Sequence, residues 1–424
     1  MIENNNEVLL RVEHLCQYFK SGKYENKAVD DVSFEIKKGE VFGLVGESGC
    51  GKTTTGRSII KIYDITGGDI YFKGQRIAAG TRKYIDNIRE AKKNARKEIS
   101  AIQREIRQNP SSKDSASEKI EKIKAELEKT IARNRAKINS ARHDHKNVDR
   151  EHAQKLCREL EEEYLPKITA AEGDAELYKK LNAEYKRKLK IAKKTKLVTQ
   201  IQMIFQDPVA SLDPRMTVKE IISEGLVING ITDQKYIDEK VYEILELVGL
   251  VREHAGRYPH EFSGGQKQRI GIARSVIMKP EMIIADEPVS ALDVSIQAQV
   301  INLLNELKEQ LGLTILFIAH DLSVVKYFSD RIGVMYFGKL VELADSDELF
   351  SHPMHPYTKS LLSAIPLPDP RSEKSRKRIH YNPLDAHDYS VDKPSLREIA
   401  PGHFVYCNDA EEQEYKEALV GTEE

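Results

Sequence analysis

The sequence lacks the features that mark a secreted, a membrane-spanning or a nucleic-acid-binding protein. Its four cysteines, at positions 16, 50, 157 and 407, are far apart and include no C-x-x-C pair, which argues against a disulfide framework or a zinc site. No signal-peptide pattern occurs, and no apolar run approaches the roughly 18 residues that span a bilayer. The 66 Lys and Arg residues balance the 67 Asp and Glu residues, which gives no electrostatic case for nucleic acid. We therefore expect a soluble protein that reaches a membrane only by docking on membrane partners.

What the sequence does contain is a glycine-rich loop between a short apolar run, residues 41–45, and a stretch with helical apolar spacing. Glycines let successive backbone N–H groups point at an anion, and the helix adds the positive end of its dipole. We expect Lys52 to lie against the β- and γ-phosphates of a nucleotide and Thr53 to hold Mg²⁺. The alternative is a turn that merely connects a strand and a helix. The predicted phosphate-binding residues are Gly46, Glu47, Ser48, Gly49, Cys50, Gly51, Lys52, Thr53 and Thr54.

A pair of carboxylates follows a second apolar run. Residues 283–286 and 314–318 read as buried parallel strands joined by a helix over 296–311, which is a βαβ unit. Asp286 at the tip of the first strand is placed to help hold Mg²⁺, and Glu287 to polarise a water for attack on the γ-phosphate. His320, after the second strand, is a candidate donor to the γ-phosphate. In isolation, the two acids could instead be surface carboxylates.

A second anion-binding pattern precedes another amphipathic helix. Ser263, Gly264, Gly265 and Gln266 stand where a helix begins. One chain does not need two such nests for one triphosphate, whereas two chains arranged head to tail do. We therefore expect an ATP-dependent dimer in which this nest contacts the nucleotide of the other chain.

Three aromatic residues of the N-terminal strands, Tyr18, Phe19 and Tyr24, could stack on an adenine ring. The pattern alone fits packing or surface aromatics equally well.

The composition changes over residues 81–196, which are rich in Lys, Glu and Arg. Apolar residues at alternating steps of three and four form a heptad seam, with Lys92 in one slot, and residues 109–112 form a break. We expect a helical hairpin or three-helix coiled coil, whose charges are either a solvated face or a docking arm. From residue 352 onward, frequent prolines predict an extended chain up to an acidic tail.

Taken together, these motifs resemble the ATP-binding cassette ATPases, and six of them occur in that family's order. The resemblance implies an α/β fold of the ABC type with a RecA-like core, an N-terminal antiparallel β-subdomain and a helical signature subdomain. The nucleotide-binding domain would span residues 7–80 and 197–345, the inserted coiled-coil arm 81–196, and a C-terminal extension 346–424. Phe19 is the best match for the adenine-stacking aromatic. Gln206 would touch Mg²⁺ and relay the nucleotide state, and residues 290–293 would line the dimer seam.

Further motifs are similar to the oligopeptide/dipeptide permease branch, among them residues 202–208 and 355–366. Residues 265–274 are similar to its F-type subunit. This resemblance implies an ATPase at the cytoplasmic face of the cell membrane. Its partners would be a homologous D-type subunit, two permease subunits and, indirectly, an extracellular peptide-binding protein.

Two alternatives stay open at this point. The chain could energise an importer for another solute, such as nickel. It could also be a chromosome-maintenance or DNA-repair ATPase, although the arm is short for that class and precedes Gln206.

Overall fold

The computed structural model describes residues 7–22, 24–108, 113–171, 173–290, 292–365, 378–390 and 392–420. Within them, an eight-stranded sheet has the order β11-β12-β10-β9-β3-β8-β7-β6. Its parallel half joins β6 (Ile201–Ile204), β7 (Met282–Asp286), β8 (Thr314–Ala319), β3 (Val41–Val45) and β9 (Arg331–Tyr336). Strands β3, β7 and β8 are buried at every position, as their continuous apolar runs predict for a parallel sheet covered on both faces.

A second, four-stranded antiparallel sheet has the order β2-β1-β4-β5. Its strands are β1 (Val8–Ser21), β2 (Tyr24–Lys37), β4 (Gly67–Phe72) and β5 (Gln75–Ala79). A hydrophobic core lies between the two sheets, where Phe34 of β2 stacks on Phe42 of β3 with ring centroids 5.1 Å apart. Ile59 of α1 (Lys52–Ile59) belongs to this core, which therefore fixes the helix that follows the glycine loop.

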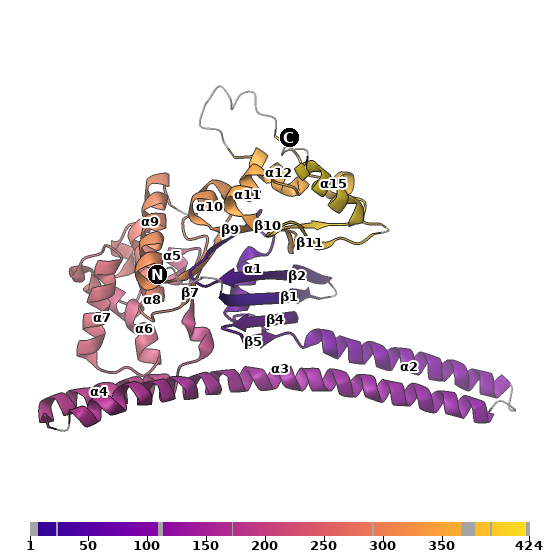
Figure 1. The fold of residues 1–424 in the computed structure, drawn as a ribbon, viewed down its shortest axis with the longest axis horizontal. Coiled ribbons are helices and arrows are strands. Elements are labelled where there is room, and N and C mark those ends of the chain that lie inside the picture. Colours follow the sequence, from indigo (N-terminus) through magenta and orange to yellow (C-terminus); the bar gives the residue numbers. More distant parts are fainter. Residues whose placement is uncertain are drawn as a thin grey trace.

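The helices between β6 and β8 pack together beside the large sheet (Figure 1). They are α5 (Pro208–Ser211), α6 (Val218–Ile228), α7 (Gln234–Leu247), α8 (Gly264–Val276) and α9 (Val294–Leu311). Helices α6 and α8 each begin with a capping box, Thr217 with Glu220 and Ser263 with Gln266, which satisfies backbone N–H groups at the helix start. Helix α10 (Leu322–Phe328) follows β8 and covers β3.

The inserted segment is helical: α2 (Arg82–Gln108), α3 (Lys113–Ala170) and α4 (Ala175–Ala192). Figure 1 shows α3 running along one side of the molecule, with α2 and α4 beside its two ends. The middle of α3 packs against the part of the chain that contains the two sheets. Val148 is buried in the core between the sheets, and Asp149 accepts a hydrogen bond from Leu197 N–H at 3.0 Å. The break expected at residues 109–112 lies outside the described residues, and supercoiling of the helices stays a prediction.

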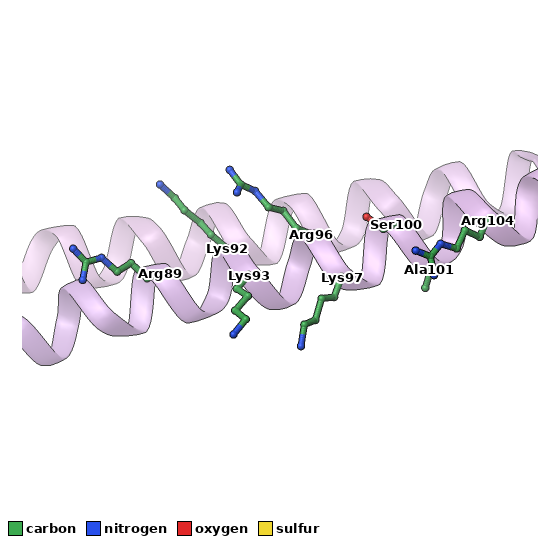
Figure 2. A pocket seen from close by; sticks show the side chains of 8 residues that line it. All are labelled: Arg89, Lys92, Lys93, Arg96, Lys97, Ser100, Ala101 and Arg104. Carbon is green, nitrogen blue, oxygen red and sulfur yellow. The ribbon is translucent and has the colours of Figure 1, made fainter. Parts of the chain in front are cut away.

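The predicted heptad seam is wrong at one position. Lys92 is exposed, and the neighbouring Ala91 is the residue that is partly buried. Lys92 instead lines a hollow on the outer surface of α2 (Figure 2). Among the residues that line the hollow, the basic ones are Arg89, Lys92, Lys93, Arg96, Lys97 and Arg104.

The extended chain expected after residue 352 is also wrong. The segment contains α12 (Pro356–Ser363), α14 (Pro383–Ala386), β11 (Ser395–Ala400), β12 (His403–Cys407) and α15 (Asp409–Val420), after β10 (Lys339–Asp345) and α11 (Ser346–Ser351). The strands β11 and β12 form a hairpin that extends the large sheet beyond β10. Pro401 and Gly402, with φ of 77° at the glycine, make the turn between them. None of the helices in the described residues is long and apolar enough to cross a membrane.

Candidate functional site

The glycine loop lies between β3 and α1 and is shaped by its glycines. Gly46, Gly49 and Gly51 have φ of 149°, 82° and 110°, which residues with a side chain rarely adopt. A Cβ at Gly51 would lie 2.2 Å from the carbonyl oxygen of Ala28. The ammonium of Lys52 donates to the carbonyls of Gly46 at 2.7 Å and Glu47 at 2.9 Å. The lysine charge therefore lies within the loop, at the start of a helix.

Cys50, in the same loop, is buried, and burial raises the pKa of its thiol. The thiol therefore stays protonated near neutral pH, which argues against a role for it as a nucleophile.

A buried carboxylate faces the loop from the end of β7. Thr53 Oγ1 donates a 2.7 Å hydrogen bond to Asp286 Oδ1, and the side chain of Asp286 is fully buried. Burial raises the pKa of Asp286, and its Oδ2 has no hydrogen-bond partner. A buried carboxylate oxygen that lacks a partner, beside a hydroxyl, fits a hard cation such as Mg²⁺. Thr53 and Asp286 are thus the residues that could hold this ion.

The second carboxylate, Glu287, is held by two side chains from neighbouring strand ends. Gln206, after β6, donates from Nε2 to Glu287 Oε2 at 2.9 Å, and Nδ1 of His320, after β8, lies 3.3 Å from the same oxygen. The backbone of Glu287 has φ of 45°, and its N–H donates to the carbonyl of Ile318 at 2.9 Å. Parallel strands bring their carboxyl ends to one edge, so three residues that are far apart in sequence meet there.

The predicted stacking aromatics lie in different environments. Phe19 is 37% exposed and meets the edge of Tyr63 with ring centroids 5.2 Å apart. The hydroxyl of Tyr18 donates to Asp30, and Tyr24 is 85% exposed. Tyr63, which sequence analysis did not single out, is therefore the aromatic partner of Phe19.

In the described part of the chain, residues 263–266, the second predicted anion-binding site, form no hydrogen bond with the glycine loop of the same chain. At the start of α8, Ser263 N–H donates to Gln266 Oε1 at 3.1 Å, and Gln266 N–H donates to Ser263 Oγ at 3.4 Å. A Cβ at Gly265 would lie 2.6 Å from Ile296 Cγ2, so this turn is packed closely against α9. Gly264 and Gly265 are the first residues of α8. The role of residues 263–266 and 290–293 in a dimer stays a prediction, and Ala291 lies outside the described residues.

Sequence analysis missed a contact between the C-terminal extension and the glycine loop. The hydroxyl of Tyr357, on α12, accepts a 3.1 Å hydrogen bond from the backbone N–H of Glu47, 310 residues away in sequence. The stretch that begins at His355 was noted as a motif, but no spacing or periodicity relates it to the loop.

Comparisons with known proteins place this geometry in a family. The family model described as ABC transporter matches residues 29–160 and 176–290, and the model described as oligopeptide/dipeptide transporter, C-terminal region, matches residues 341–391. The oligopeptide transport ATP-binding protein OppF of Bacillus subtilis is 45% identical over 406 residues, which are 96% of this chain and 98% of that protein. The dipeptide transport ATP-binding protein DppF of Lactococcus lactis is 41% identical over 412 residues, 96% of each chain. The similarity thus extends through the helical insertion and the C-terminal extension.

Proposed function

This chain belongs to the ABC transporter family, and from that premise we propose that it is the ATP-hydrolysing subunit of a membrane importer of oligopeptides or dipeptides. The observation that carries the proposal is the meeting of Lys52, Thr53, Asp286 and Glu287 at one sheet edge, in a chain that aligns over nearly its whole length with transport ATP-binding proteins.

Each residue of the site has a separate role in ATP binding or hydrolysis. The loop amides and Lys52 bind the β- and γ-phosphates of ATP, and Phe19 stacks on the adenine. Thr53, Asp286 and Gln206 would hold Mg²⁺, which would neutralise charge on the phosphates. Glu287 accepts a proton from the water whose oxygen attacks the γ-phosphorus, as the bond to the β–γ bridging oxygen breaks and ADP leaves. Gln206 and His320 orient Glu287, and His320 also donates to the γ-phosphate.

The same proposal assigns partners and a location. The start of α8, residues 263–266, contacts the nucleotide held by a homologous D-type subunit, so that ATP joins the two chains head to tail. Two permease subunits hold this pair at the cytoplasmic face of the membrane, and an extracellular binding protein delivers the peptide. Support for this arrangement comes from the exposure of Ser263 and Gly264 at the start of α8 and from the names of the relatives.

The experiment that tests the proposal is purification of the C-terminally tagged full-length chain from detergent-solubilised membranes, followed by identification of the co-purifying proteins. An untagged strain is the control. We expect two polytopic permeases and a second cassette ATPase. Recovery from the soluble fraction with nucleic acid or a nuclease, and without permeases, would overturn it. Recovery of permeases whose binding protein takes a metal ion would overturn the assignment of the solute.

A further inference from the structure

The C-terminal extension touches the phosphate loop through one buried tyrosine. Tyr357 is the second residue of α12, is 2% exposed, and accepts the hydrogen bond from Glu47 N–H. The loop itself is open to solvent at Glu47, Ser48 and Gly49. The tyrosine therefore supports a part of the loop that solvent would otherwise surround.

The tyrosine ring is fixed by its neighbours. It packs against Tyr336, at the end of β9, with ring centroids 4.3 Å apart, and against Tyr381 at 5.6 Å. Burial raises the pKa of Tyr357, so its hydroxyl stays neutral at physiological pH. A neutral hydroxyl on an immobile ring is a hydrogen-bond acceptor in a defined position.

The start of α12 is in turn anchored to the large sheet. His355 Nδ1 accepts from the backbone N–H of Tyr357 at 3.1 Å, which caps the helix. The buried carboxylate of Glu342, on β10, accepts from the N–H groups of Met354 at 2.7 Å and His355 at 3.1 Å. His403 of β12 lies 2.9 Å from the same carboxylate. A continuous set of buried contacts thus connects the β11–β12 hairpin with the phosphate loop.

The other end of the loop is also held. The N–H of Gly338, in the turn after β9, donates to the carbonyl of Cys50 at 2.9 Å. A loop fixed at both ends before a ligand arrives loses less conformational freedom on binding, and the affinity rises accordingly.

We propose that Tyr357 is a positioning residue for ATP: its hydroxyl holds the loop backbone at Glu47 in the conformation that receives the phosphates. The inference rests on the proposed function, since it concerns the affinity of the same nucleotide site. It assigns the C-terminal extension a part in nucleotide binding.

The test compares two variants of the full-length chain, each of which removes one phenol hydroxyl from the same aromatic cluster. In Tyr357→Phe we expect the Kd for ATP with Mg²⁺ to rise about 3- to 10-fold, the effect of losing one neutral hydrogen bond. In the assembled complex, KM for ATP should rise likewise while kcat at saturating ATP changes less than about twofold. In Tyr381→Phe, the matched control, Kd should equal that of the wild type.

Two results would overturn the inference: an unchanged Kd in Tyr357→Phe, or an equal rise in both variants, which would indicate a general loss of packing. Lys52→Ala separates this inference from the proposed function. If Lys52→Ala abolishes nucleotide binding and Tyr357→Phe does not weaken it, only the role of Tyr357 fails. If Lys52→Ala still binds ATP normally, the nucleotide site itself is wrongly assigned.

Discussion

At the scale of single residues, hydrolysis depends on the carboxylate of Glu287, which Gln206 and His320 hold in place. In Glu287→Gln the side chain keeps its shape but cannot accept a proton. We expect ATP hydrolysis by the assembled complex to fall by about 100- to 10,000-fold, the usual contribution of a general base, while ATP binding persists. Phosphate release and equilibrium nucleotide binding measure the two effects. Glu309→Gln, on the exposed face of α9, is the control, and near wild-type turnover in Glu287→Gln would refute the assignment.

The buried carboxylate of Asp286 lowers the free energy of unfolding of the chain at neutral pH. Burial raises the pKa of Asp286 above its ordinary value of 3.8, so the folded chain binds this proton more tightly than the unfolded chain. The carboxyl therefore lowers the free energy of unfolding as pH rises from below 3.8 through the raised pKa, and the cost persists at neutral pH.

Asp286→Asn removes the charge that burial disfavours. At pH 7 and without nucleotide, we expect the variant to melt at the same or a higher temperature than the wild type, whereas Mg²⁺-dependent ATP hydrolysis is lost. Calorimetry and phosphate release are the measurements, and Asp347→Asn, on an exposed turn of α11, is the control. A clearly lower melting temperature for Asp286→Asn would contradict the account.

The residues of the site differed in how far the sequence could predict them. Lys52 and Asp286 belong to short motifs whose local context, strand and then loop, could be read from the order of apolar and polar residues. The meeting of Gln206 with Glu287 depends on strand order, and that of Tyr357 with Glu47 on the docking of a helix 310 residues away. No local pattern encodes such contacts.

At the scale of elements, the heptad spacing predicted helices in the insertion because an apolar seam needs a partner helix. It could not predict that α3 continues for 58 residues, about 87 Å at 1.5 Å per residue, and packs its middle against the body. Val148 and Asp149 make that attachment, and both lie outside any repeated pattern. The β11–β12 hairpin was missed because prolines around it suggested an extended chain, although residues 403–407 alternate between buried and partly buried positions.

The outer part of the α2–α3 hairpin should be dispensable for nucleotide binding. We expect that replacing residues 93–128 with a short glycine–serine linker leaves the Kd for ATP unchanged, because α2 packs on α3 there and the attachment at Val148 is kept. Isothermal titration calorimetry of the truncated variant and of the wild type measures the affinity. Val148→Ala is the contrasting variant and should lower the melting temperature, because it removes buried apolar atoms. A folded truncation variant, judged by circular dichroism, that no longer binds ATP would contradict this expectation.

At the scale of the whole molecule, the large sheet brings together residues from distant parts of the chain. Its parallel half collects Lys52, Gln206, Glu287 and His320 at one edge, and its antiparallel half carries the C-terminal extension to the phosphate loop. The helical insertion lies along the opposite side of the molecule from that extension (Figure 1). The C-terminal extension thus contacts the nucleotide site directly, whereas the helical insertion lies along the N-terminal sheet.

The central claim, that hydrolysis in this chain drives peptide import, is tested most directly by uptake of a labelled oligopeptide. Proteoliposomes would hold the complete transporter with wild-type, Glu287→Gln or Glu309→Gln chains. We predict ATP-dependent uptake with the wild type and Glu309→Gln, and almost none with Glu287→Gln. Uptake by Glu287→Gln at the wild-type rate, or the absence of peptide uptake by a wild-type complex that hydrolyses ATP, would contradict the claim.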